Sequence, residues 1–411
     1  MKKLIGNAVV GQSGGPTAAI NATLSGVIRG ALENSDTIGT IFGMKNGIEG
    51  FLKEDFVNLN EFFADRDKLE ILEQTPAAAL GSCRKKLPDP ESGDPIFEKI
   101  AEIFKKYDIR YFFYIGGNDS MDAVDKLSRY FAKTDYEVRV IGVPKTIDND
   151  LCGTDHSPGF GSAAKYIAVT MQEIIRDCSV YRVPAVTVVE IMGRDAGWLT
   201  ASSALGKLVS GVAPDLVYLP ERAFDLEKFF ADLERIQKDH PAVVVAVSEG
   251  IRFADGRYVG EGTQSGATDA FGHKYLAGTG KMLELAIKDR LGCKVRSIEV
   301  NLPQRCAAHL QSKTDIDESV CVGKTAVSAA ISGESRVMMG IQRVSTNPYA
   351  AKIEGADISK IANQVRGVPA EFINEEGNGV TDECLEYLLP LIAGEVNVKF
   401  DRGLPEHLII K

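Results

Sequence analysis

Short, almost continuously apolar runs alternate with helical patterns along most of this chain, and this alternation constrains its fold more than any other feature. The runs have the length and composition of buried strands, and they cover residues 5–11, 37–42, 110–115, 138–143, 186–191, 216–219, 243–247 and 294–300. Helical patterns lie between them at 16–33, 96–107, 120–133, 162–178 and 225–238. Strands that are apolar on both faces are typical of parallel sheets covered by helices. We therefore expect an α/β fold with right-handed crossovers and mainly parallel sheets.

A chain of 411 residues is too long for one ordinary core, so we expect two lobes. No repeat or low-complexity linker marks the boundary, and the lengthening of loops favours a break near residue 155. We predict two Rossmann-like three-layer lobes with an active site in the cleft between them. The first would combine residues 1–155 with about 305–350, and the second would be 156–304. Residues from about 351 to 411 would form a C-terminal extension of unknown role.

Charge and cysteine content exclude several classes of function. A net charge of −10 argues against nucleic-acid binding, which needs a basic surface. The longest clean apolar run, 241–247, is far shorter than a membrane span. The seven cysteines are scattered and never form a CxxC pair, so we expect neither a disulfide framework nor a zinc site. A reducing cytoplasm is the simplest compartment, and any anionic substrate requires a local concentration of basic residues.

A glycine-rich turn, GQSGGP at residues 11–16, follows the first expected strand. Pro16 suits the first position of a helix, where backbone N–H groups can bind an anion. A plain tight turn is the alternative. The same residues also match the nucleophile elbow G-x-S-x-G, with Ser13 as nucleophile. A hydrolase would then need a partner histidine, for which the candidates are His273, His309 and His407.

Two more polar turns follow neighbouring strands, GGNDS at residues 116–120 and PKTIDND at 144–150. Asp119 should point into the ligand crevice. For the Asp-Asn-Asp run at 148–150, a solvated turn is the alternative interpretation. Residues 322–325, VGKT, resemble the end of a P-loop but lack the upstream glycine and lie in a helical pattern. Residues 159–164 resemble a dinucleotide fingerprint but follow a polar loop instead of a strand. Neither segment predicts nucleotide binding.

Seven motifs in the same order give the chain a resemblance to the phosphofructokinase family over about residues 5–345. They are SGGPTAAIN, LGSCRKK, GGNDS, PKTIDND, VVEIMGR, AVSEG and LPQR. The resemblance implies phosphoryl transfer to the 1-hydroxyl of fructose 6-phosphate in glycolysis or gluconeogenesis, with Mg²⁺ as cofactor. It places the donor on the first lobe and the sugar phosphate on the second.

The resemblance also implies roles for individual residues. Asp148 would be the general base, and Lys145 would offset charge in the transition state. Donor-binding residues would be Gly14, Gly15, Arg84 and Lys145. Residues that hold fructose 6-phosphate would be Thr146, Asp148, Met192, Gly193, Arg194, Glu249, Arg296 and Arg305.

Asp119 and Lys145 bear on the identity of the donor. ATP-using members of the family generally carry glycine at both positions, and the paired replacement resembles pyrophosphate-dependent members. A carboxylate at 119 would occupy the space of a nucleotide α-phosphate, whereas pyrophosphate ends before that point. An Asp119 that merely caps a helix is the alternative. The alternative functions are an ATP-dependent phosphofructokinase, a kinase for another acceptor such as sedoheptulose 7-phosphate, and a non-catalytic sugar-phosphate sensor.

Three positions depart from the family pattern. Asn118 replaces an aspartate that helps to bind Mg²⁺, which leaves Asn118, Asp119 and Asp148 as alternative metal ligands. Leu302 replaces a histidine that contacts the sugar phosphate in many ATP-using members, so sugar contacts there should differ. Ala185 replaces an arginine that reaches across a subunit interface, with Arg182 or Arg176 as substitutes. We therefore expect a non-allosteric enzyme, forming a homodimer or homotetramer.

Overall fold

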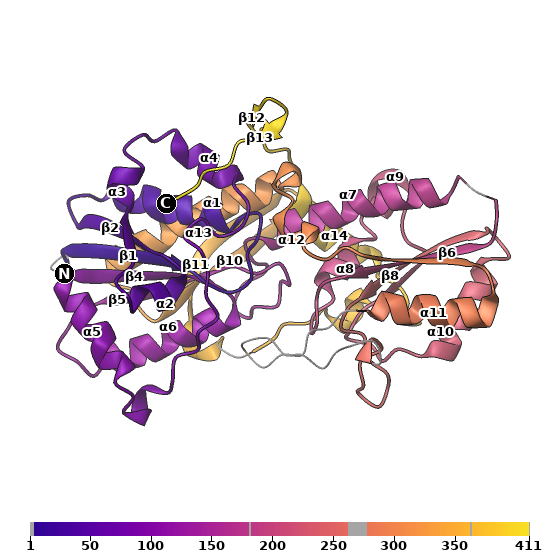
Figure 1. The fold of residues 1–411 in the computed structure, drawn as a ribbon, viewed down its shortest axis with the longest axis horizontal. Helices are drawn as coiled ribbons and strands as arrows, with labels where there is room; N and C mark the ends of the chain where they lie inside the picture. The colour runs from indigo at the N-terminus through magenta and orange to yellow at the C-terminus, as the bar shows by residue number, and fades with distance from the viewer. Residues whose placement is uncertain (1–3, 181, 262–277, 362–363, 411) are drawn as a thin grey trace.

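The computed structural model describes residues 4–180, 182–261, 278–361 and 364–410, which form two α/β lobes (Figure 1). The first lobe contains a seven-stranded sheet in the order β11-β10-β5-β4-β1-β2-β3, and the second contains a four-stranded sheet in the order β7-β8-β6-β9. The strands are β1 Gly6–Gln12, β2 Ile38–Met44, β3 Phe56–Asn58, β4 Ile109–Gly116, β5 Arg139–Pro144, β6 Ala185–Ile191, β7 Leu216–Tyr218, β8 Ala242–Ser248, β9 Lys294–Glu299, β10 Val337–Thr346 and β11 Tyr349–Asp357.

The predicted fold class is confirmed. All eight expected strands occur, with ends within about two residues of the expected positions. The second sheet is parallel throughout, and the first is parallel except for β3 and β11, which pair antiparallel at its two edges. The strands β10 and β11 were not expected, because they lack the uniform apolar character of doubly covered strands.

Helices cover both faces of each sheet (Figure 1). The longer ones are α1 Ile20–Glu33, α5 Ile96–Lys106, α6 Asn118–Phe131, α7 Phe160–Cys178, α10 Leu226–Ile236, α11 Thr279–Leu291 and α13 Lys313–Ser332. The shorter ones are α2 Gly47–Phe51, α3 Leu59–Phe62, α4 Lys68–Gln74, α8 Trp198–Ser202, α9 Gly206–Ser210, α12 Pro303–Cys306 and α14 Asp382–Leu388. The expectation that Pro16 opens the first helix is wrong, since α1 begins at Ile20. The intervening residues form an irregular connection that borders the site described below.

The chain crosses between the lobes more than once. The elements from α7 to α12 belong to the second lobe. The chain then returns to the first lobe, where α13 packs on α1 and β10 pairs with β5. Residues of α14 then pack into the core of the second lobe. Finally, the side chain of Gln74 holds the last segment against the first lobe through hydrogen bonds with Lys399 and Glu406. The C-terminal segment, including the short pair β12 Phe400–Asp401 and β13 Leu404–Pro405, therefore contacts both lobes.

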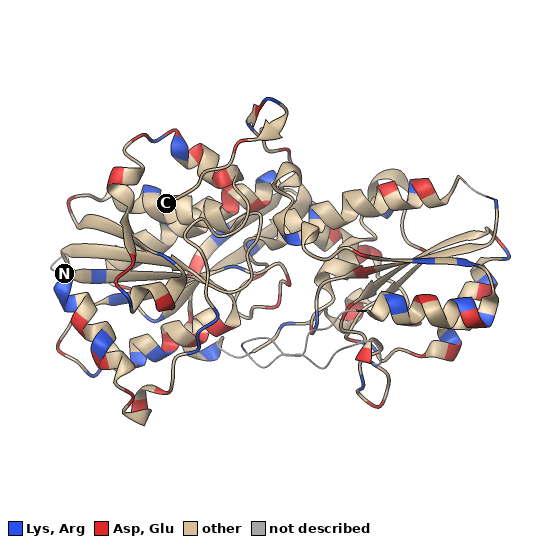
Figure 2. Cartoon of the chain, in the orientation of Figure 1, with Lys and Arg blue, Asp and Glu red and all other residues tan. Residues whose placement is uncertain are grey.

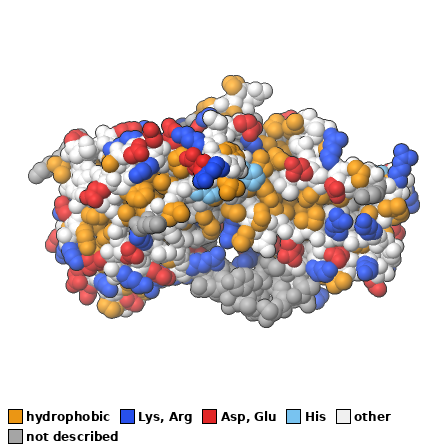
Figure 3. Space-filling view, turned by 45° about the horizontal axis from the view of Figure 1, so that its top comes forward, with side chains coloured by type: hydrophobic (Ala, Val, Ile, Leu, Met, Phe, Trp, Pro, Cys, Tyr) orange, Lys and Arg blue, Asp and Glu red, His pale blue; other side chains and the backbone are white. Residues whose placement is uncertain are grey.

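Charged side chains of both signs are interspersed over the outer helices α5, α6, α10 and α11 (Figure 2). The face shown in Figure 3 is likewise a mixture of basic and acidic groups. None of the helices in the described part of the chain is long and apolar enough to cross a membrane. All seven cysteines are free thiols.

Candidate active site

A cavity of about 990 Å³, which we call the interlobe pocket, lies at the carboxyl ends of strands from both sheets. Ligands of open α/β sheets bind at these strand ends. Most of the residues predicted from the sequence line this pocket: Gly14, Gly15, Arg84, Asn118, Asp119, Lys145, Thr146, Asp148, Met192, Arg194, Glu249 and Arg305. Gly193 lies between two lining residues. Arg296 is exposed on the edge strand β9 and is not among the described residues that line the pocket of its own chain.

The turn after β1 forms one wall of the pocket. Gly14 has a φ of +77°, which favours glycine, and its N–H donates to the carbonyl of Cys83. A Cβ atom on Gly14 would lie 3.5 Å from Nζ of Lys145, and one on Gly15 would lie 3.5 Å from Nη1 of Arg305. These two glycines therefore bring bare backbone close to two cationic side chains, an arrangement suited to an anion.

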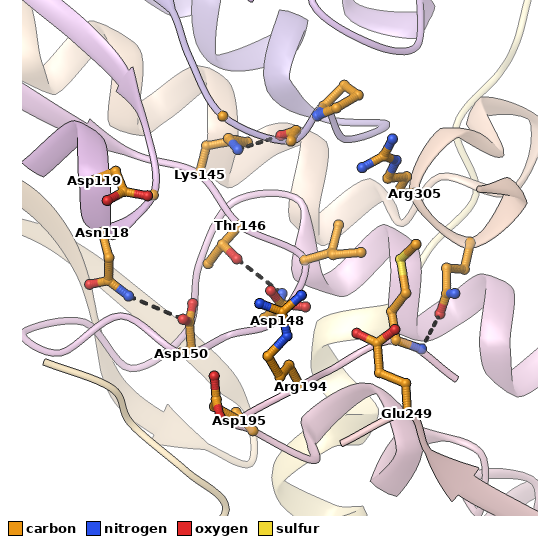
Figure 4. A pocket seen from close by; sticks show the side chains of 18 of the residues that line it. Asn118, Asp119, Lys145, Thr146, Asp148, Asp150, Arg194, Asp195, Glu249 and Arg305 are labelled. Carbon is orange, nitrogen blue, oxygen red and sulfur yellow. Dashed lines mark hydrogen bonds between the residues drawn. The ribbon is translucent and has the colours of Figure 1, made fainter. Parts of the chain in front are cut away.

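Lys145 follows β5 and lies at the base of the pocket with only 3% of its surface exposed. Its Nζ donates to the carbonyl of Gly15 (Figure 4). Burial lowers the pKa of Lys145 to about 8, against the opposing influence of Asp148 and Asp150. Lys145 is therefore cationic at neutral pH and close to its titration range.

Asp148 lies on the turn after β5, which is held in shape by its neighbours. The hydroxyl of Thr146 accepts the Asp148 N–H at 3.1 Å. Asn149 has a φ of +55° and accepts the Ser157 N–H through its side chain, which fixes the left-handed backbone between the two aspartates. Burial, together with the charge of Asp150, raises the pKa of Asp148 to about 7, although Lys145 and Arg194 oppose the shift. A carboxylate with this pKa can accept a proton near neutral pH.

Asn118 is the first residue of α6, opposite this turn, and one atom of its side chain has no hydrogen-bond partner. Its Nδ2 donates to Oδ2 of Asp150 at 3.1 Å, whereas its Oδ1 is buried without a hydrogen-bond partner (Figure 4). No group of three or more His, Cys, Asp or Glu side chains in the described residues could hold a metal ion alone. A Mg²⁺ ion, which needs only one or two protein oxygens in addition to substrate phosphates and water, fits Asn118 and the neighbouring carboxylates.

Asp119 does not cap a helix. The N-cap of α6 is Gly117, without a side-chain cap, and Asp119 instead forms an ion pair with Lys86 at 3.3 Å between Oδ1 and Nζ. Both residues line the pocket and are partly exposed. The structure therefore shows Asp119 as a carboxylate at the pocket wall, held beside a cation.

The second lobe contributes the loop after β6. Gly193 has a φ of +126°, and its N–H donates to Oε1 of Glu249 at 3.3 Å. Burial and the nearby Asp148 raise the pKa of Glu249 to about 8. Arg194 extends toward Asp148 and has a buried Nε without a partner, so it retains a donor for a ligand (Figure 4). A mostly neutral Glu249 beside a cationic Arg194 suits a ligand that carries both hydroxyl groups and negative charge.

Met192 and Arg305 lie where the second lobe approaches the turn after β1. The N–H of Met192 donates to Oε1 of Gln304, which fixes α12 against the β6 loop. Arg305 ends this region beside Gly15, and burial together with Arg84 lowers its pKa. Leu302, 52% exposed, lines the same wall.

Several pocket residues were not predicted, namely Asp150, Glu190, Asp195, Glu299, Asn301, Gln304 and Val365. Asp150 lies two residues after Asp148 in the same motif, and Asp195 directly follows Arg194, so position near predicted residues could have indicated both. The position of Val365 could not be predicted, because its segment does not follow an expected strand and contains no motif that would place it near the pocket.

The hydrolase alternative finds no support. The Ser13 hydroxyl shares a hydrogen bond with the Ser120 hydroxyl, and no histidine is among the described residues of the pocket. His309 lies in the short helix Ala308–Leu310, and His407 lies in the C-terminal segment. His273 lies outside the described residues.

Comparison with known proteins identifies relatives over nearly the whole length. The model of the family described as phosphofructokinase matches residues 7–320. A protein of Halomonas elongata named pyrophosphate--fructose 6-phosphate 1-phosphotransferase is 43% identical, over 97% of this chain and 95% of that protein. A protein of the same name from Methylococcus capsulatus is 40% identical, over 98% of this chain and 96% of that protein.

A solved structure gives the same result. The pyrophosphate-dependent phosphofructokinase of Nitrosospira multiformis superimposes with a TM-score of 0.88 at 38% identity. The match covers 98% of this chain and 96% of that one.

Proposed function

The chain belongs to the phosphofructokinase family, and we propose that it transfers a phosphoryl group from inorganic pyrophosphate to the 1-hydroxyl of fructose 6-phosphate. The products are fructose 1,6-bisphosphate and phosphate. The observation that carries the choice of donor is the placement of Asp119 and Lys145 together on the wall of the interlobe pocket. The names of the full-length relatives support the same choice. Because pyrophosphate is a lower-energy donor than ATP, the reaction is expected to be reversible.

In this proposal Asp148 is the general base. The sugar 1-hydroxyl gives its proton to the Asp148 carboxylate as its oxygen forms a bond to the terminal phosphorus. The bridging P–O bond breaks, and inorganic phosphate leaves with that electron pair. The Lys145 ammonium offsets the negative charge that develops on the transferred group and the leaving oxygen. The pKa of about 7 for Asp148 and its approach to Arg194 support this assignment.

Donor binding is assigned to the first lobe. Gly14 and Gly15 present the backbone of the turn after β1, and Arg84 and Lys145 supply positive charge. Asp119 selects the donor, because a carboxylate at this wall repels the α-phosphate of a nucleotide and leaves pyrophosphate unaffected. The ion pair with Lys86 supports a fixed position for that carboxylate.

Acceptor binding is assigned mainly to the second lobe. Met192, Gly193, Arg194 and Glu249 would hold fructose 6-phosphate beside Thr146 and Asp148. Arg305 would hold the 6-phosphate, and paired arginines can bind one phosphate by bidentate hydrogen bonds.

In this proposal Arg296 acts through a second copy of the chain. Its exposure on the edge strand β9, away from its own pocket, supports a homo-oligomer in which it reaches the phosphate bound by a neighbour. The seven free thiols support a reducing cytoplasm.

Mg²⁺ would be held by Asn118 Oδ1, with Asp150, Asp148 or Asp119 as the nearby carboxylates. When bound, it would neutralise phosphate charge.

We further propose that the donor lobe is formed by residues 1–155 and about 305–350, and the sugar lobe by 156–304. The membership of β10 in the first sheet and of β6 to β9 in the second supports this division.

A coupled assay for fructose 1,6-bisphosphate tests the proposed function. Purified chain, Mg²⁺ and fructose 6-phosphate are supplied with either pyrophosphate or ATP, and Asp148→Asn serves as the control for contaminating kinases. We expect turnover with pyrophosphate only, and a loss of about a thousandfold in Asp148→Asn. Turnover with ATP only would refute the proposed donor, and no turnover with either would favour a sensor.

A further inference from the structure

Residues 364–369, QVRGVP, lie beyond the part of the chain that the family model matches and cross the junction between the lobes. We call this segment the strap. Its contacts differ from those of an ordinary surface loop, because they fall on the two loops that carry Asp148 and Arg194.

The backbone of Arg366 bonds to both of these loops. Its N–H donates to the carbonyl of Asp150 at 2.8 Å, in the turn that contains Asp148. Its own carbonyl accepts from Nε1 of Trp198 at 3.1 Å, immediately after the loop that contains Arg194. A single residue of the strap therefore fixes the spacing between the two loops.

The side chain of Arg366 reinforces the same junction. Nη1 donates to the carbonyls of Thr154 and Asp155, and Nη2 donates to the hydroxyl of Tyr387 at 3.1 Å. The guanidinium also lies over the ring of Trp198, which is fully buried, with Cζ 4.6 Å from the ring centroid. A planar, multidentate cation is well suited to hold several carbonyls and a ring in one arrangement.

Glu221 ties the strap to the Arg194 loop a second time. Its Oε1 accepts the N–H of Val368 at 2.7 Å and the N–H of Gly197 at 2.8 Å. A Cβ atom on Gly367 would approach the same oxygen to 3.2 Å, so glycine permits this close passage. Val368 is buried in the core of the second lobe.

The strap also forms part of the pocket wall. Val365 lines the interlobe pocket with 52% of its surface exposed. Its side chain is therefore available to a bound ligand, next to the residue that joins the two loops.

We propose that the strap positions the Asp148 turn against the Arg194 loop, and that Arg366 is its positioning residue. This inference rests on the proposed function for the roles of Asp148 and Arg194. Arg366 does not touch substrate; it acts by holding the carboxylate of Asp148 in reach of the acceptor that Arg194 binds. It gives a role to part of the C-terminal extension.

The test compares Arg366→Met and Arg366→Lys with Arg343→Met in the full-length chain. Arg343 lies at the same junction, with Nε 3.1 Å from Oδ2 of Asp155 and Cζ over the rings of Tyr387 and Tyr349, but its described hydrogen bonds reach neither the 144–150 turn nor the loop after β6. We expect Arg366→Met to lower kcat by about ten- to a hundredfold. The reason is that a displacement of the reacting groups by about 1 Å lowers the rate by a factor of this size. Arg366→Lys should recover part of kcat, and Arg343→Met should lose thermal stability but keep the wild-type kcat.

Equal loss of kcat in Arg366→Met and Arg343→Met, without recovery in Arg366→Lys, would show that the strap only stabilises the fold and would overturn the proposal. If Arg366→Met does not fold, Val365→Asp supplies the test: a carboxylate at the wall should raise the KM for fructose 6-phosphate at least tenfold, and an unchanged KM would count against the proposal. A wild-type chain that uses ATP would refute the proposed donor alone, and the same comparison would then be made with ATP.

Discussion

Burial shifts the pKa values of Asp148 and Lys145 toward one another. It raises that of the aspartate to about 7 and lowers that of the lysine to about 8, because each charged form loses hydration in the pocket. In the proposed mechanism, Asp148 must be ionised to act as the base and Lys145 must be protonated to offset charge. The two active forms therefore coexist mainly between these values.

We predict a bell-shaped dependence of kcat/KM on pH. Activity should fall below about pH 7 as Asp148 gains a proton, and above about pH 8 as Lys145 loses one. Lys145→Arg keeps its charge at all these pH values, so its alkaline limb should disappear even if its maximum is lower. The ionisation of the substrates is common to both proteins and cancels in the comparison. An alkaline limb that persists near pH 8 in Lys145→Arg would show that another group is responsible.

We also propose that two single residues, Asp119 and Lys145, decide which phosphoryl donor is used. We expect Asp119→Gly combined with Lys145→Gly to lower kcat/KM for pyrophosphate by about a hundredfold, because a preorganised cation is lost from the transferred group. The single Asp119→Gly variant should mainly improve use of ATP, since it removes a carboxylate from the wall. Initial rates with each donor measure both effects. Unchanged pyrophosphate kinetics in the double variant would remove this explanation of donor choice.

Among the elements, the buried strands and the polar turns after them were predictable, because parallel strands are apolar throughout and their ends carry the ligand. The same reasoning failed where tertiary contacts decide. Pro16 suits a helix start, yet the turn is held by the segment at Cys83 and α1 begins later. The strap was not predicted, since only its folded position brings Val365 to the pocket and Arg366 to both loops.

The P-loop-like segment, residues 322–325, contains a glycine that lets two helices pack closely. It lies within α13, as its pattern predicts, and its Gly323 allows close contact with α1: a Cβ atom there would lie 2.3 Å from the carbonyl oxygen of Thr23. On α1, a Cβ atom on Gly26 would likewise lie 2.1 Å from the carbonyl oxygen of Val320 in α13.

We predict that Gly323→Ala destabilises the chain by roughly 1–3 kcal/mol, because the clash is with backbone and outweighs the better helix propensity of alanine. Ser328→Ala, exposed on the same helix, is the matched control and should change stability by less than about 0.5 kcal/mol. Urea unfolding monitored by circular dichroism gives both values. A Gly323→Ala protein as stable as the control would mean that the two helices can separate at little cost.

For the whole molecule, the arrangement of the two lobes explains how an acidic chain can bind two anions. The net charge is −10, yet basic side chains from both lobes converge on the interlobe pocket, including Arg84, Lys145, Arg194 and Arg305. Each lobe alone carries only half of the site, and the returning C-terminal segment holds the halves together. In the proposed reaction, the first lobe would present the phosphoryl group and the second lobe would present the hydroxyl that attacks it.

The most direct test of this account is a ³¹P NMR time course on one sample of the protein with Mg²⁺, fructose 6-phosphate and pyrophosphate. We predict that the pyrophosphate signal decays while inorganic phosphate and the 1-phosphate of fructose 1,6-bisphosphate grow in equal amounts. Adding phosphate and fructose 1,6-bisphosphate to a second sample should regenerate pyrophosphate. A persistent pyrophosphate signal, with the 1-phosphate appearing only after ATP is added, would contradict the proposed reaction.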